Sequence, residues 1–170
     1  MHEPGPPTAW DSTLVGAVRG YLLAMVRRAD LADDLAQEVF CRAWQARQRY
    51  VEQGNAKAYL LRIADRLLCD RARKAGRETQ LGDEAWRQVE PQGRETSPAE
   101  NLERSEAVAA LHAALDALSP LQRRALLLRY YGQLSFAEIA ETLECPLGTV
   151  LSHCRRGLLA LRERLVEERE

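Results

Sequence analysis

Apolar residues recur every three or four positions in three stretches of the first half of the chain, the spacing of a helix that buries one face. The stretches predict helices over residues 14–26, about 30–48 and about 56–75. Ser12 is expected to cap the first helix, and Gly76 is expected to end the third. Residues 50–55, which include Gly54 and Asn55, are predicted to form a loop before the third helix.

The second half carries three helix-start signatures, in each of which a serine is followed three residues later by Glu or Gln. In this capping box, the two side chains satisfy backbone N–H groups that the first turn of a helix leaves free. The serines are Ser97, Ser119 and Ser135, and a proline follows the first two. Helices are therefore predicted to begin at residues 98, 120 and 136, with a last helix over residues 147–166. Gly132 and residues 144–146 are expected to end the two helices that precede it.

Residues 77–96 are polar, contain glycine and proline and show no sustained period, which predicts a linker. Aromatic residues make up only 6% of the chain, and Leu, Ala, Arg and Glu dominate, as is typical of helical proteins. We therefore predict an all-α protein of two small helical domains joined by a flexible linker, the C-terminal one a helix-turn-helix. The expected parts are a disordered N-terminus (1–11), a first domain (12–76), the linker (77–99) and a second domain (100–170).

Composition limits the classes of protein to which the chain can belong. No apolar run reaches the length of a membrane span, and the proline-rich N-terminus is unlike a secretory signal. A cytoplasmic protein without membrane insertion is therefore expected. The four cysteines lack a C-x-x-C pair, so reduced thiols are favoured over a zinc site. No metal and no cofactor are expected.

The net charge of −1 hides a strong segregation of charge along the chain. Residues 30–38 contain four acidic side chains and no basic one. Residues 42–77 contain ten Lys or Arg against three acidic residues, a net charge of +7. A basic block beside an acidic one suggests two different partners.

The strongest signal is the segment 135–156, where a short helix, a tight turn and a longer helix fit a helix-turn-helix. The apolar residues expected to pack the two helices together are Ile139, Ala140, Leu143, Val150, Cys154 and Leu158. The second helix then presents short polar groups and arginines, which can reach base edges in a major groove or hold phosphates. A plain helical hairpin with a solvated polar face is the alternative for this segment.

Two further clusters suit other partners. The 50–55 loop and the basic helix after it combine an aromatic ring, amides and cations, as binding of single-stranded nucleic acid requires. Asp34, Gln37 and Glu38 share one face of the second helix with Asp33 nearby, and this acidic face would suit a basic protein partner. Taken alone, each cluster is also consistent with an ordinary solvated charged face.

The order of the three clusters resembles that of the extracytoplasmic-function (ECF) sigma factors, the compact branch of the sigma-70 family. Residues 33–40 look like the polymerase-binding helix of that family, and residues 54–71 look like its −10-recognition helix. The segments that resemble its −35-reading domain are residues 118–123, 134–140 and 148–150. The resemblance covers about residues 12–76 and 100–166, and its two halves support each other.

The resemblance implies an alternative sigma factor that directs RNA polymerase to promoters and initiates transcription of a specific set of genes. The polymerase would perform the chemistry, so the chain itself is not expected to be an enzyme. The implied partners are core RNA polymerase, promoter DNA and an anti-sigma factor. On the polymerase, the implied contacts are the coiled coil of the largest subunit and the flap of the second-largest subunit.

Motif matching also implies which residues make these contacts. The residues that would bind polymerase are Asp33, Asp34, Gln37, Glu38 and Phe40. Those that would contact the melted −10 element are Tyr50, Gln53, Asn55, Lys57, Arg62, Arg66, Arg73 and Lys74. Those that would contact the −35 duplex are Ser135, Thr149, Ser152, His153, Arg155 and Arg156.

The chain departs from the family at Leu151 and His153, where relatives often carry a basic residue. His153 is expected to be mostly neutral near pH 7, and residues 106–170 have a net charge of −1. Promoter affinity would then depend on polymerase holding both domains at once.

Two alternatives remain open. One is a sigma-like interaction module that sequesters an anti-sigma factor without reading DNA. The other is an ordinary repressor or activator that uses only the C-terminal domain, although this would leave the acidic and basic helices of the first half unexplained.

Overall fold

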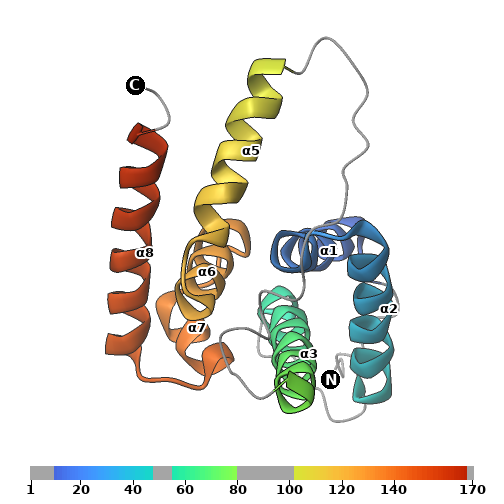
Figure 1. The fold of residues 1–170 in the computed structure, drawn as a ribbon. Helices are drawn as coiled ribbons and strands as arrows, with labels where there is room; N and C mark the ends of the chain where they lie inside the picture. The colour runs from blue at the N-terminus through green and yellow to red at the C-terminus, as the bar shows by residue number, and fades with distance from the viewer. Residues whose placement is uncertain (1–9, 48–54, 80–101, 168–170) are drawn as a thin grey trace.

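The structure is a computed structural model that describes residues 10–47, 55–79 and 102–167. Within these ranges every regular element is helical, which confirms the all-α prediction. The elements form two groups, an N-terminal domain of α1 to α3 and a C-terminal domain of α5 to α8 (Figure 1). No helix of the described part is long and apolar enough to cross a membrane. Of the predicted linker, only residues 77–79 are described, and they belong to a helix.

The N-terminal domain consists of α1 (Ser12–Val26), α2 (Ala29–Gln45) and α3 (Ala56–Thr79). The prediction that Ser12 caps α1 was wrong by one residue. The N-cap is Asp11, which has an extended backbone and accepts a hydrogen bond from the Leu14 N–H at 2.8 Å. The carboxylate reaches the third helical N–H, as a good N-cap does, so Ser12 becomes the first helical residue.

The prediction that Gly76 ends α3 was also wrong, because the helix continues to Thr79. A glycine within a helix costs only about 1 kcal/mol relative to alanine. A glycine ends a helix when it adopts the left-handed conformation itself, whereas Gly76 remains part of the helix. Helix α3 therefore continues into the first residues of the segment predicted as a linker.

The C-terminal domain contains α5 (Leu102–Asp116), α6 (Pro120–Leu126), the π-helical segment η2 (Leu127–Tyr131), α7 (Phe136–Leu143) and α8 (Leu147–Glu167). Both capping boxes that fall in the described part, at Ser119 and Ser135, are present. The third, at Ser97, lies outside the described residues. Glu144 takes a left-handed conformation (φ 52°) and ends α7, as the sequence predicts for residues 144–146.

The π-helical segment was not predicted from the sequence. In it the Gly132 N–H donates to the Leu127 carbonyl oxygen, five residues back, at 2.8 Å. The wider turn leaves Tyr130 and Tyr131 exposed on the side of the segment. Gly132 then ends it, as expected, where an added Cβ would lie 2.9 Å from the Leu61 side chain of α3. The same Cβ would lie 2.7 Å from the Leu128 carbonyl oxygen, so the backbone of the segment itself disfavours a side chain at this position.

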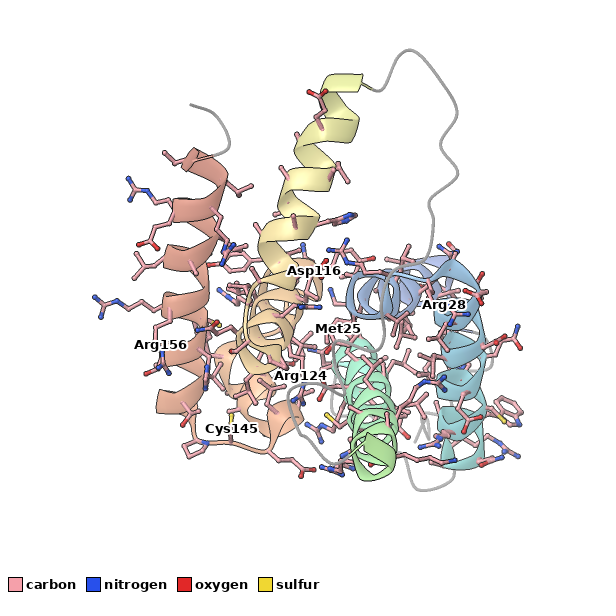
Figure 2. All side chains as sticks on the ribbon, in the orientation of Figure 1. Met25, Arg28, Asp116, Arg124, Cys145 and Arg156 are labelled. Atoms are coloured by element: carbon pink, nitrogen blue, oxygen red, sulfur yellow. The ribbon has the colours of Figure 1, made fainter. Side chains whose placement is uncertain are left out.

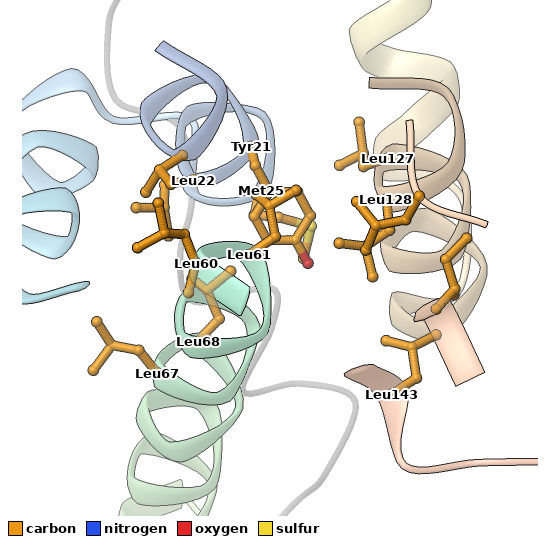
Figure 3. Close-up of a cluster of buried hydrophobic side chains, with 14 of the residues drawn as sticks. Tyr21, Leu22, Met25, Leu60, Leu61, Leu67, Leu68, Leu127, Leu128 and Leu143 are labelled. Carbon is orange, nitrogen blue, oxygen red and sulfur yellow. The ribbon is translucent and has the colours of Figure 1, made fainter. Parts of the chain in front are cut away.

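One buried cluster joins the two domains. In Figure 3, Tyr21, Met25 and Leu61 of the N-terminal domain face Leu127 and Leu128 of the C-terminal domain. Burial of large apolar side chains is the main favourable contribution to such packing. The domains therefore form one continuous core rather than two cores separated by solvent.

The packing inside the helix-turn-helix follows the prediction at most positions. Ile139, Leu143, Val150 and Cys154 are buried, but Leu158 is 42% exposed, so its predicted place in the core was wrong. The buried position at that turn is Gly157, where a Cβ would lie 2.8 Å from the Leu126 side chain. Gly157 thus packs against α6, and Leu158, the next residue along α8, lies on the exposed side of the helix.

Candidate nucleic-acid interface

The candidate recognition helix is α8, and the elements before it fix its position. The Ser135 hydroxyl accepts from the Glu138 N–H at 3.2 Å, which sets the start of α7. The same hydroxyl donates to the Glu138 carboxylate at 2.8 Å, so this side chain is already used within the cap. The turn after α7 then begins α8 at Leu147. Ser135 thus positions the motif.

The polar face predicted on α8 is present. Ser152, Arg155 and Arg156 are exposed, and Thr149 and His153 are half-buried. In Figure 2, Arg156 lies on the side of α8 remote from α1 to α3. The Arg156 Nε donates to the Ser152 carbonyl oxygen at 3.3 Å, which leaves the rest of its guanidinium available. This face remains accessible for a nucleic acid to bind.

His153 has the neutral character that the sequence suggests. Its burial, with a smaller contribution from the charge of Arg156, lowers the pKa of the imidazole below the ordinary value of 6.5. The Nδ1 atom is buried and has no hydrogen-bond partner within the described structure. His153 therefore adds a polar edge to the face and no positive charge near neutral pH.

The basic helix α3 carries the second predicted DNA-binding set, and much of it faces the C-terminal domain. Arg62 pairs with Glu141, and Arg66 pairs with Glu144, each at 2.6 Å. Asn55 caps α3 by accepting from the Ala58 N–H at 3.0 Å.

Two further hydrogen bonds join α3 to the C-terminal domain beside these ion pairs. The Asn55 amide donates to the Glu138 carboxylate, and the Lys57 ammonium donates to the Gln133 amide oxygen at 3.3 Å. Arg73 and Lys74 lie farther along α3 and are exposed. The sequence predicted these side chains as a group but did not predict that α7 would cover part of it.

A buried ion pair lies beneath these surface contacts. The Arg124 guanidinium of α6 donates two hydrogen bonds to Asp65 of α3, at 2.7 and 2.5 Å. The Tyr21 hydroxyl of α1 donates to the same carboxylate at 2.7 Å. Asp65 is 1% exposed and Arg124 is 8% exposed. A single carboxylate within the apolar stripe of α3 was the available signal for this network, and sequence reasoning missed it.

The network shifts the titration of its members. Burial and the adjacent Asp65 raise the pKa of Tyr21 well above 10.0. Burial opposes the positive charge of Arg124, but its hydrogen bonds to Asp65 and the charge of that carboxylate outweigh this and raise its pKa. Both donors thus stay protonated, and a buried charge with this many hydrogen bonds can be accommodated.

The acidic face of α2 is exposed as predicted at Asp33, Asp34, Gln37 and Glu38. No basic residue occurs within residues 30–38, but two of the acidic side chains have basic partners from outside this range. Asp33 pairs with Arg19 at 2.5 Å, and Glu38 pairs with Arg42 at 2.7 Å. Asp34 and Gln37 have no polar side-chain partner among the residues that the structure describes.

Three residues of the predicted sites remain. One of them, Phe40, is packed against another ring, and the other two lie outside the described residues. Phe40 is half-buried, with its ring centroid 5.9 Å from that of Trp10. Tyr50 and Gln53 lie outside the described residues, so their contact with single-stranded DNA stays a prediction. The cysteines are unpaired, and no group of three potential metal ligands occurs within the described ranges.

Comparison with known proteins places this geometry in a family. The sigma-70 region 2 model matches residues 12–78, and the sigma-70 region 4 model matches residues 109–161. The ECF RNA polymerase sigma factor SigE of Mycolicibacterium smegmatis is 36% identical over 137 residues, which are 80% of this chain and 52% of that protein. The chain thus spans about half the length of this relative.

Two further comparisons cover more of the matched protein. SigK of Mycobacterium tuberculosis, also an ECF RNA polymerase sigma factor, is 29% identical over 151 residues, 85% of this chain and 78% of that protein. The sigma factor RpoE of Bartonella quintana, solved in complex with the anti-sigma factor NepR, superposes with a TM-score of 0.71 at 27% identity, over 90% of this chain and 92% of that one. Both helical domains match in their order along the chain, and the protein belongs to the ECF branch of the sigma-70 family.

Proposed function

We propose that the protein is an alternative sigma factor that binds core RNA polymerase and directs it to promoters through both domains. The observation that carries this proposal is the exposed face of α8, with Ser152, Arg155 and Arg156 on a helix whose start is fixed by a capped helix-turn-helix. Such a helix enters the major groove with its N-terminal part and contacts base edges from its exposed polar face. The polymerase supplies the chemistry, and the protein works where polymerase is, in the cytoplasm.

The N-terminal domain is proposed to hold the melted −10 element. The cations of α3 suit a single-stranded backbone, and Tyr50, which precedes α3 in the sequence, would stack on an unpaired base. Arg73 and Lys74 are exposed, which supports a role in backbone contact. Lys57, Arg62 and Arg66 can join them once α7 no longer covers them.

Two surfaces are proposed to bind polymerase. On α2, Asp34 and Gln37 are exposed and are candidates to contact a basic coiled coil on the largest subunit. On the C-terminal domain, exposed large apolar side chains favour the flap of the second-largest subunit as partner. These side chains are Leu111, Leu158, Leu159 and Val166. Leu159 and Val166 line a surface hollow of about 400 Å³.

A second candidate function is a sigma-like module that sequesters an anti-sigma factor. The observation in its favour is that a sigma factor similar to this chain over 90% of its length was solved with an anti-sigma factor bound. An anti-sigma factor is a proposed partner under either function. The two functions differ in whether the protein itself starts transcription.

Transcription in vitro separates the two. Core polymerase with this protein would be incubated with genomic DNA of the source organism, and the 5′ ends of the transcripts would be mapped by sequencing. The proposed function requires a new set of start sites that share two upstream elements and that disappear when the protein is omitted. Binding to core without new start sites would favour the sequestering module.

A further inference from the structure

We propose that Leu151 of α8 reads a thymine of the −35 element by packing on its methyl group in the major groove. The inference rests on the proposed role of α8 as the helix that reads this element. It names a base that the promoters of this protein contain and the side chain that selects it. Leu151 was not among the side chains of α8 that the sequence predicted to contact DNA.

The exposure of Leu151 carries the first step. In the first turns of α8, Leu147 is 48% exposed and Leu151 is 45% exposed, whereas the neighbouring Val150 and Cys154 are 0% and 4% exposed. The core of the domain thus uses Val150 and Cys154 and leaves both leucines to the solvent. Because they are four residues apart, the two leucines are neighbours on the helix surface. Two adjacent exposed leucines indicate an interaction surface more strongly than a single scattered one.

The place of Leu151 on α8 carries the second step, because it is continuous with the proposed DNA-binding face. Ser152 follows it directly, and Arg155 lies one turn farther along the same side of the helix; all three are exposed. Leu151 thus lies on one flank of Ser152, and Arg156 lies on the other. A recognition helix enters the major groove with its N-terminal part, which brings both flanks to base edges. Duplex DNA therefore covers Leu151 when α8 binds.

The chemistry of the groove selects the base. Thymine presents a methyl group there, whereas the edges of the other bases present amino, carbonyl or ring-nitrogen groups. A leucine neither donates nor accepts a hydrogen bond, so against these groups it would displace water and leave a polar atom unpaired. Against thymine, the contact instead removes apolar surface from water on both partners. Leu151 therefore favours thymine on the strand that it faces.

The low charge of this part of α8 supports reading by an apolar contact. Residues 147–157 contain two arginines, Arg155 and Arg156, and no carboxylate. His153 adds no positive charge near neutral pH, because its burial lowers the pKa of the imidazole. Each phosphate that a cation neutralises contributes about 0.9 to the salt dependence of binding, so two arginines hold few phosphates. Contacts to bases must then supply a larger share of the affinity, and Leu151 is placed to make one.

The test removes single methyl groups from the DNA. Promoters mapped with core polymerase and this protein supply the templates, and each thymine of the −35 element, on either strand, is replaced in turn by deoxyuridine. Deoxyuridine keeps every hydrogen-bonding group of thymine, so the replacement changes only the methyl contact. Run-off transcription by the complex with core polymerase is then measured at limiting protein. At one or more of these thymines, transcription should fall about fourfold, the factor that burial of one methyl group gives.

The variant Leu151→Ala assigns the effect to one side chain. It should fold, because the position is exposed and alanine is the better helix former. With this variant, the same deoxyuridine replacement should have no effect, since the two partners of one contact do not add when both are removed. The matched control is Val15→Ala, which trims a side chain of α1 that is 40% exposed and lies outside the proposed contacts. It should keep the fourfold response of the parent.

Leu151→Arg tests the chemical nature of the contact. A cation at this position exchanges the methyl contact for a phosphate contact. The variant should therefore lose the response to deoxyuridine, and its promoter affinity should fall more steeply with salt, by about 0.9 in the logarithmic slope. If Leu151→Arg kept the full response to deoxyuridine, another side chain would contact the methyl group, and the proposal would be wrong.

Failure of this assignment can be distinguished from failure of the proposed function. If the parent tolerates deoxyuridine throughout the −35 element, or if Leu151→Ala responds as strongly as the parent, Leu151 does not read thymine. The exposed leucine would then belong to the surface for a protein partner. If no start sites appear with core polymerase, or if the −35 element can be scrambled without loss, the role of α8 itself is wrong. If scrambling is harmful and deoxyuridine is harmless, that role stands and the assignment of Leu151 alone is overturned.

Discussion

At the scale of single residues, Asp65 is the one carboxylate that is buried among the residues that the structure describes. It lies within the apolar face of α3, and its charge is accepted because Arg124 and Tyr21 donate three hydrogen bonds to it. Each donor comes from a different helix. This carboxylate therefore ties α1, α3 and α6 together at one point, and its partners set how the two domains meet.

The Tyr21 hydroxyl gives this network a measurable pH dependence. Because the folded pKa of Tyr21 lies above the ordinary value of 10.0, the tyrosine contributes stability that is complete below pH 10.0 and is lost as the pH rises toward the folded value. Tyr21→Phe should lower the free energy of unfolding by about 1 kcal/mol at neutral pH, the net value of one hydrogen bond. The free energy of unfolding of the variant should also fall less than that of the parent as the pH rises above 10.0. Urea unfolding at a series of pH values measures this difference. If the free energy of unfolding fell equally in the variant and the parent, groups other than Tyr21 would be responsible for the loss of stability at high pH.

Arg155 and Arg156 allow base reading and backbone contact on α8 to be separated. Arg156 shares a face with Thr149, Ser152 and His153, and it can make a bidentate contact with guanine worth about 1–3 kcal/mol of discrimination. Arg156→Ala should therefore relax the preference at one base pair of the −35 element. Arg155→Ala should weaken all promoters about equally and flatten their salt dependence. The measurement is transcription from a library of −35 variants, and equal losses on every promoter with both variants would contradict base reading by Arg156.

At the scale of the elements, the sequence predicted those helix boundaries that are determined by residues close to one another in the chain. Ser119 and Ser135 mark helix starts because cap and helix lie within three residues of each other. The prediction that Gly76 ends a helix was wrong because a glycine does so only when it adopts the left-handed conformation. The prediction that Leu158 is buried was wrong because α6, which is distant from it in the sequence, packs against Gly157 instead.

The acidic face of α2 is smaller than its sequence suggests, and this changes which variant tests it. Asp33 and Glu38 already pair with Arg19 and Arg42, so reversing them would also disturb the protein itself. Asp34→Lys with Gln37→Lys leaves those pairs intact. It should weaken binding to core polymerase by roughly 2–3 kcal/mol, as expected for like charges brought together at an interface.

Co-elution of the Asp34→Lys/Gln37→Lys variant with core polymerase on gel filtration measures the loss. Unchanged circular dichroism would show that the helices are intact. The control variant Glu106→Lys reverses a charge at a position away from the acidic face of α2. Undiminished co-elution of the double variant would exclude α2 as the polymerase contact.

At the scale of the whole molecule, the sequence predicted two domains and did not predict how they pack. The polar contacts that join them link positions far apart in the sequence: Arg62 and Glu141 are 79 residues apart, Asp65 and Arg124 are 59, and Gly16 and Tyr131 are 115. No local period encodes such a pairing. The sequence predicted the cations of α3 as a surface for nucleic acid and predicted no partner for the glutamates of α7, whereas the structure pairs Arg62 and Arg66 with Glu141 and Glu144.

Closure of the whole molecule can be fixed covalently to ask whether the domains must separate. With the four native cysteines replaced by alanine, Gly16→Cys and Tyr131→Cys place one thiol on each side of the interface near α1. A short cleavable cross-linker between them should reduce transcription by core polymerase about tenfold or more, because α7 then stays paired with Arg62 and Arg66 of the proposed DNA-binding surface. Cleavage of the linker should restore it, because the thiols lie outside the proposed contacts with DNA and polymerase. Each single-cysteine variant, treated with the same reagent, should transcribe normally. If the cross-linked protein initiates as efficiently as the cleaved one, promoter binding takes place with the domains closed, and the contacts between α7 and α3 do not control it.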